Sequence, residues 1–177
     1  MKRDANLVPL SRQHFRALVL CMRIHRKRAQ RGVLQREMLS LYAEDVRFHF
    51  QAEEKFLFPA ARRLPEAAPL VRELLAEHKK LRRAFTAARR RTLKSAELTR
   101  FADLLEAHIR KEERRLFEEC QKQMSEKALS ALGARMQAYF RKHEAASGSS
   151  CKLPGATRQA RGYGFSRTVA GRKQKGL

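Results

Sequence analysis

The sequence lacks an apolar run long enough to cross a bilayer, and it contains few cysteines. The stretch from Ala17 to Met22 is too short for a membrane segment, and the first residues lead into no signal peptide, so we expect a cytoplasmic protein without a membrane partner. The three cysteines, Cys21, Cys120 and Cys151, are widely spaced and form no metal-binding or redox motif. Such thiols fit a reducing compartment.

The sequence also lacks the motifs of several enzyme classes. It has no His-Glu-x-x-His zinc-protease helix, no Gly-rich phosphate loop and no Gly-x-Ser-x-Gly elbow. Hydrolase and nucleotide-dependent functions therefore lack support. Because no general acid, general base or substrate pocket is evident, the sequence does not indicate catalytic turnover.

Acidic residues are scarce, with 18 Asp and Glu against 40 Lys and Arg and a net charge of +22. Basic runs such as residues 25–28 and 89–91 could neutralise phosphates. The alternative function is therefore a basic helical protein that binds nucleic acid or another polyanion, with a metal site that is structural or absent. No DNA- or RNA-binding motif accompanies these runs, and a solvated basic surface is the competing interpretation.

The chain is rich in helical periodicity. Long stretches with a 3.6-residue period are broken by turns near Gly32, at Leu64-Pro65 and near Lys94-Ser95, and no alternating apolar runs appear. This pattern predicts an all-α fold, an up-and-down four-helix bundle over residues 1–145 whose short extra C-terminal helix, 126–145, is capped by Ser125. Residues 146–177 are rich in Gly, Ser, Arg and Lys and predict a disordered basic tail.

One pattern of ten residues occurs twice, beginning at His49 and at His108. Each copy places a glutamate four residues after the histidine, Glu53 and Glu112, so that both side chains share one helical face. The flanking residues show that this face is apolar and points into the core. Burying an ionised carboxylate without a partner is costly. The pattern therefore predicts two similar His/Glu pairs that bind metal.

Two further histidines, His14 and His78, lie on apolar faces of the other two predicted helices. The chain lengths on either side of each turn are nearly equal, which places His14, His49, His78 and His108 at one level of an antiparallel bundle. Four imidazoles and two carboxylates suit iron, manganese or zinc. Two ions that share the carboxylates as bridges would use all six donors.

These residues resemble the hemerythrin-like (hemerythrin HHE) cation-binding proteins. The resemblance rests on Leu10-Ser11-Arg12-Gln13-His14, His49-x-x-x-Glu53, Glu77-His78 and His108-x-x-x-Glu112-Glu113, and it spans roughly residues 8–145. It implies a four-helix bundle with two non-haem iron ions joined by an oxo or hydroxo bridge, manganese or zinc being secondary alternatives. By this resemblance the metal ligands are His14, His49, Glu53, His78, His108 and Glu112.

The sequence departs from the oxygen-carrying members of that family at Leu74, where they have a fifth histidine. The resemblance therefore implies a protein that binds or senses dioxygen, peroxide, nitric oxide or iron itself, rather than a simple oxygen carrier, and that passes its signal to a separate partner. Glu113 is the alternative to Glu112 as the second bridging carboxylate. A metal-free bundle whose buried His and Glu side chains pair with one another is a further alternative.

Overall fold

The computed structural model describes residues 2–27 and 29–148, with side chains to residue 143. This part of the chain consists of helices joined by short turns and contains no strand. Two continuous helical rods, residues 31–61 and 95–123, include three π-helical segments, here labelled η. The elements are α1 Val8–His25, α2 Arg31–Leu41, η1 Tyr42–Val46, α3 Arg47–Ala52, η2 Glu53–Leu57, α4 Phe58–Ala61, α5 Ala68–Arg89, α6 Ser95–Lys111, η3 Glu112–Leu116, α7 Phe117–Gln123 and α8 Glu126–Gly148.

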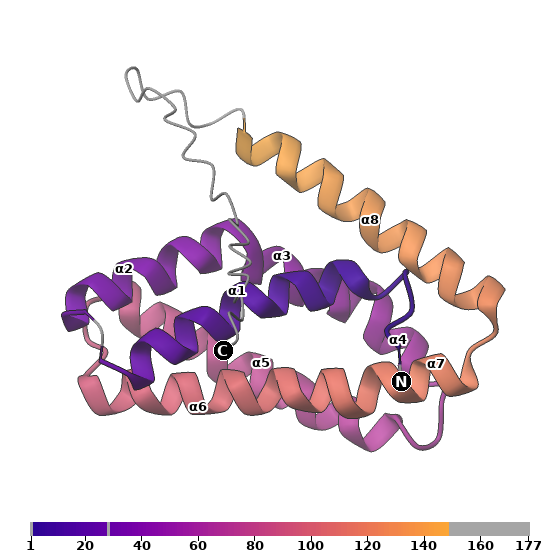
Figure 1. Cartoon of the computed structure of the whole chain (residues 1–177), viewed down its shortest axis with the longest axis horizontal. Coiled ribbons are helices and arrows are strands. Elements are labelled where there is room, and N and C mark those ends of the chain that lie inside the picture. The colour runs from indigo at the N-terminus through magenta and orange to yellow at the C-terminus, as the bar shows by residue number, and fades with distance from the viewer. Residues whose placement is uncertain (1, 28, 149–177) are drawn as a thin grey trace, which may run out of the picture.

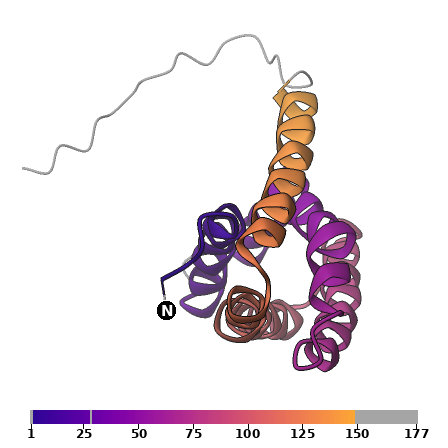
Figure 2. The ribbon, with the colours of Figure 1, turned by 90° about the vertical axis from the view of Figure 1, so that its right-hand side faces the viewer.

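Four rods form the bundle, namely α1, the run from α2 to α4, α5, and the run from α6 to α7 (Figure 1). Helix α1 packs against α6 and α2, and α5 packs against the same two helices. Helix α8 lies across α3 and η2, and its far end projects away from the bundle (Figure 2). The predicted four-helix bundle with an extra C-terminal helix is confirmed.

The turns differ slightly from those expected. The first turn lies between Arg26 and Gln30, where Lys27 has φ 47°, and Gly32 already belongs to the first turn of α2. The turns around Leu64-Pro65 and before Ser95 lie where they were predicted.

Helix α8 begins as predicted but extends further. The Ser125 hydroxyl accepts a hydrogen bond from the Ala128 amide at 3.3 Å, which confirms the N-terminal cap. The helix continues to Gly148, past the predicted boundary at residue 145. The rest of the predicted basic tail, residues 149–177, lies outside the described residues. No helix in the described ranges is long and apolar enough to cross a membrane.

The core consists of two apolar clusters with a polar layer between them. On α1, Leu10 belongs to one cluster and Ala17 to the other, with His14 between them. On α5, Leu74 and Leu81 flank His78 in the same way. The rods that carry His49 and His108 repeat this arrangement, so the apolar packing of both clusters holds the four histidines at one level.

Candidate metal centre

The structure brings the six predicted residues together in the polar layer. His14 comes from α1, His78 from α5, and the other four from the His-x-x-x-Glu repeats on the remaining two rods. All six residues are buried, with relative exposures of 4% for His14 and His49 and 0% for the other four. Ionisable groups buried this completely require compensating charge.

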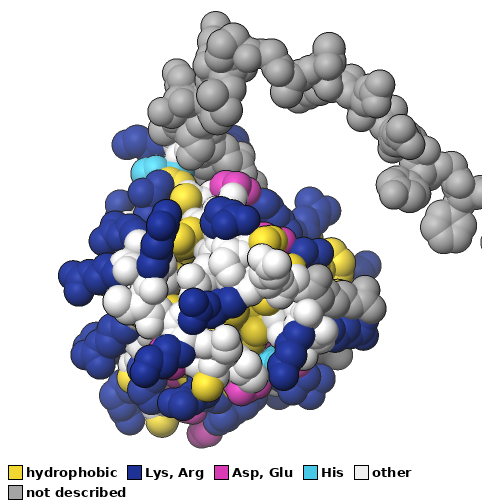
Figure 3. Space-filling model, turned by 90° about the vertical axis from the view of Figure 1, so that its left-hand side faces the viewer, with side chains coloured by type: hydrophobic (Ala, Val, Ile, Leu, Met, Phe, Trp, Pro, Cys, Tyr) yellow, Lys and Arg dark blue, Asp and Glu magenta, His cyan; other side chains and the backbone are white. Residues whose placement is uncertain are grey.

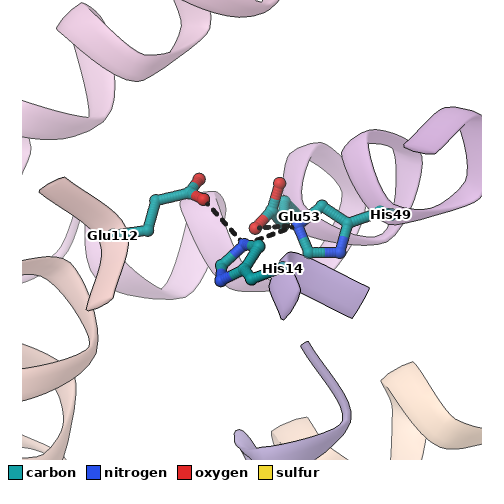
Figure 4. Close-up of side chains that lie close together, drawn as sticks. All are labelled: His14, His49, Glu53 and Glu112. Atoms are coloured by element: carbon teal, nitrogen blue, oxygen red, sulfur yellow. Dashed lines mark hydrogen bonds and ion pairs between the residues drawn. The ribbon is translucent and has the colours of Figure 1, made fainter. Parts of the chain in front are cut away.

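The donor atoms form a closed ring in which each carboxylate oxygen faces one imidazole Nε2. Glu112 lies 3.1 Å from His14 and 3.2 Å from His108, and Glu53 lies 3.1 Å from His49 and 3.4 Å from His78. The ring closes through nitrogen pairs, with His14 Nε2 3.0 Å from His49 Nε2 and His78 Nε2 3.1 Å from His108 Nε2. The inward-pointing side chains of one half of the ring appear in Figure 4.

The ring divides into two groups of four donors that share both glutamates. In each group the ligand atoms lie within 4.8 Å of one another. One group is His14, His49, Glu53 and Glu112, and the other is Glu53, His78, His108 and Glu112. This sharing is the arrangement expected of two cations bridged by two carboxylates.

The shared carboxylates are the test of whether a cation fits. All four oxygens of Glu53 and Glu112 are buried, and none has a hydrogen-bond partner in the described structure. Buried polar atoms are rarely left unsatisfied, and four such oxygens in one small volume favour a cation at their centre. The residues present therefore fit a metal centre.

Each imidazole donates its other nitrogen, Nδ1, to an oxygen behind it. His14 donates to Glu113 at 2.7 Å and His78 to Glu54 at 2.7 Å. In the same way Gln13 accepts from His49 at 2.8 Å, and Glu77 from His108 at 2.9 Å. Because Nδ1 carries the hydrogen, the neutral imidazole presents the Nε2 lone pair to the centre, as metal-binding histidines do.

Three of these outer acceptors are themselves paired with bases. Arg82 donates to Glu54 at 2.7 Å and Arg3 to Glu113 at 2.8 Å, while Lys111 contacts Glu77. Burial alone would raise the pKa of Glu54, but hydrogen bonds from His78 and Arg82 outweigh it and hold the pKa at about 2. The outer carboxylates therefore stay ionised and keep orienting the imidazoles.

Both glutamates of the ring begin a π-helical segment, η2 at Glu53 and η3 at Glu112. Single turns of π-helix inside α-helices are frequent at functional sites. In each segment the first glutamate faces the ring and the second, Glu54 or Glu113, accepts from a histidine of another rod. The structure therefore places Glu112, rather than Glu113, in the ring.

The protonation of the metal-free ring follows from its charges. Burial lowers the pKa of His14, but its close contacts with the carboxylates of Glu112 and Glu113 outweigh burial and raise it to about 9. Burial likewise opposes the charged form of His108, yet the negative charge of Glu112 and the hydrogen bond to Glu77 raise its pKa to about 10. Without a cation, protons on these imidazoles balance the two carboxylates.

A small cavity adjoins the half of the ring that contains His14 and His49. Its volume is about 10 Å³, enough for one molecule of water size. Most of its wall is apolar, formed by Ala17, Val46, Phe50, Leu105 and Ile109.

The remaining histidines lie away from the ring, as expected. His25 lies 3.6 Å from both Asp103 and Glu106, and the ring of His143 stacks on Phe48. Sequence reasoning missed Gln13, Glu54 and Glu77 as outer acceptors. One signal could have found Glu54, because the Glu-Glu pair occurs in both copies of the repeat.

The bundle and its centre define an all-α cation-binding protein. The model of one family, described as the hemerythrin HHE cation binding domain, matches residues 9–120. This range includes α1 to α6 and all six residues of the ring, and the chain therefore belongs to that family. No curated protein and no solved structure matches the chain significantly.

Proposed function

We propose that the protein holds two non-haem iron ions and uses them to bind or sense dioxygen or a related small molecule, such as peroxide or nitric oxide. The proposed ligands are His14, His49, Glu53, His78, His108 and Glu112, with the two glutamates as bridges. The observation that carries the proposal is the closed ring of four Nε2 atoms and four carboxylate oxygens that have no other hydrogen-bond partner.

The donor set supports iron. Imidazole and carboxylate suit iron, manganese and zinc, whereas calcium prefers oxygen alone and copper(I) prefers sulfur. No cysteine belongs to either donor group. Paired carboxylate-bridged sites inside helical bundles are a known setting for di-iron chemistry, and the resemblance in sequence points to the same metal.

Bound iron would supply redox chemistry and open coordination positions for a small ligand. The chain's own residues hold the ligands in place, because the Nδ1 acceptors fix the orientation of each imidazole ring. The apolar clusters above and below the layer limit access of water.

The small cavity beside His14 and His49 supports a ligand of few atoms. Its volume excludes an organic substrate, whose pockets usually measure about 300–1,000 Å³. On the other half of the centre, one turn before His78, the buried side chain of Leu74 offers no donor. Each ion would therefore have four protein donors from this set, which leaves room for an exogenous ligand.

The test is an optical spectrum of protein purified in air, then reduced and exposed to oxygen or nitric oxide. We expect ferric absorption that bleaches on reduction and returns with oxygen, and a distinct spectrum with nitric oxide. Iron that is present but unresponsive to both gases would contradict a role in binding or sensing them.

A further inference from the structure

One end of the bundle is almost free of acidic residues. It is formed by the C-terminal ends of α1 and α5 and the N-terminal ends of α2 and α6 (Figure 1). Residues 5–36 and 78–96 contain no Asp or Glu at all. Figure 3 views the molecule from this side, where Lys and Arg side chains far outnumber acidic ones.

A pocket of about 480 Å³ opens at this end between α2 and the C-terminal end of α5. Four of its lining residues are arginines, Arg31 and Arg36 from α2 and Arg89 and Arg91 from the end of α5 and the loop after it. The volume lies within the range of about 300–1,000 Å³ that is usual for small-molecule sites.

In the described part of the chain, no acid pairs with the four pocket arginines, in contrast to two arginines of α1. Arg23 is bound to Glu37 at 2.7 Å, and Arg16 to Glu44 at 2.9 Å. Within the described ranges none of the four pocket arginines forms an ion pair with a carboxylate. Four like charges around one concave surface repel one another, and an anion between them would remove that repulsion.

Arg91 occupies a backbone position that usually belongs to glycine. Its φ is 60°, in the left-handed region, and its amide donates to Ala88 O at 3.0 Å to close the end of α5. A side chain here is unfavourable because Cβ crowds the backbone. The strain is compatible with a role for the Arg91 guanidinium in the pocket.

The two walls of the pocket are tied together. The Gln35 side chain, only 9% exposed, donates to the carbonyl of Leu93 at 2.6 Å and so joins α2 to the loop that carries Arg91. The N-terminal turn of α2 makes a smaller contribution to the attraction of an anion, since it contains no acid and no side chain caps it.

We propose that this pocket binds the oligophosphate chain of a small molecule, such as inorganic tripolyphosphate or a nucleoside triphosphate. Guanidinium groups bind phosphate oxygens through paired hydrogen bonds, and several of them match the charge of a phosphate chain. The site is separate from the metal centre and independent of its function.

The test is titration calorimetry of the full-length protein, as purified, with tripolyphosphate and with ATP. We expect one molecule bound per chain, and about tenfold weaker binding in the double variant Arg31→Gln/Arg36→Gln. The matched control is Arg62→Gln/Arg63→Gln, which removes the same charge from exposed positions after α4 and should bind as the wild type does.

Arg91→Gly separates binding from folding. Glycine is favoured at this backbone position, so the melting temperature should stay the same or rise while phosphate binding weakens. Similar affinities for tripolyphosphate and ATP would identify the phosphate chain as the recognised group. Tighter binding of ATP would indicate that the pocket also contacts the nucleoside.

Three results would overturn the proposal. The first is that neither probe binds at low salt, and the second is that the pocket and control variants lose affinity equally. The third is that a DNA duplex binds far more tightly than tripolyphosphate and is weakened alike by both double variants. That last result would show that the basic surface as a whole binds nucleic acid, without a specific site in this pocket.

Discussion

At the scale of single residues, each of the four buried histidines uses its two ring nitrogens differently. Nδ1 donates outward to an oxygen, and Nε2 faces the carboxylates of Glu53 and Glu112. The outer oxygen fixes which nitrogen can accept a cation and where it points. The centre therefore depends on residues that would never touch the metal.

Glu54→Ala tests this dependence. It removes the acceptor of His78 Nδ1 and should weaken iron binding by about 10- to 100-fold, since the ring is then free to rotate. Glu54→Gln keeps an acceptor oxygen and should weaken binding less. Metal titration of the stripped proteins gives the affinities, with Glu44→Ala, whose carboxylate pairs with Arg16 away from the ring, as the control. Equal affinity in Glu54→Ala and the wild type would refute the role of the outer acceptor.

The raised pKa values of His14 and His108, about 9 and about 10, make the metal-free protein sensitive to alkali. Their protonated forms stabilise the fold fully below the unfolded pKa of about 6.5, and this contribution is lost as the pH rises through 9 and 10. The melting temperature of stripped protein should therefore fall between about pH 7 and pH 10. Thermal unfolding across that range checks this, and a flat or rising profile would contradict it.

Metal affinity should change in the opposite direction over the same range. An ion must displace the protons on His14 and His108, so binding releases protons and strengthens as the pH rises. Calorimetry in buffers of different ionisation enthalpy measures that release. Binding without proton release would show that the stripped ring is already deprotonated.

At the scale of elements, much of the centre could be predicted because its spacing follows helical geometry. The His-x-x-x-Glu repeats and the chain lengths between turns placed all six side chains on one level, as the structure shows. The π-helical segments could not be predicted, because they change backbone hydrogen bonds without changing the repeat. Gln13 and Glu77 were missed because a polar residue next to a buried histidine also fits a solvated face.

Helix α8 shows a close approach that sequence patterns do not reveal. A Cβ atom on Gly133 would lie 2.5 Å from Asn6 Oδ1 and 2.6 Å from Asn6 Cβ. Gly133 therefore allows α8 to pack against the segment before α1.

Gly133→Ala should lower the melting temperature, even though alanine is the better helix former by about 1 kcal/mol. The reason is the clash with Asn6, which must move or displace α8. Thermal unfolding measures the effect, and Ser130→Ala, at an exposed position of the same helix, should leave stability unchanged or raise it. A more stable Gly133→Ala protein would show that the contact with Asn6 is unimportant.

At the scale of the whole molecule, two apolar clusters enclose one layer of buried charge. The clusters contain most of the buried apolar side chains and should keep the bundle helical when the metal is removed. The layer between them is then left with Glu53 and Glu112 balanced only by protons.

Removing the metal with a chelator should therefore lower the melting temperature without abolishing the helical circular dichroism spectrum. A ligand that binds only the folded state stabilises it, by about 2.7 kcal/mol at a hundred times its dissociation constant. Re-addition of iron should restore the original melting temperature. An unchanged temperature after chelation, with loss of metal verified, would argue that the layer is satisfied without a cation.

The number of ions per chain tests the central claim most directly. Because both glutamates are shared between the two donor groups, we expect about two irons per chain by elemental analysis and native mass spectrometry. The variant Glu53→Ala removes a bridge from both groups and should lose both ions together. A wild-type protein with a single ion, or with none when purified and supplied with iron, would contradict the paired centre.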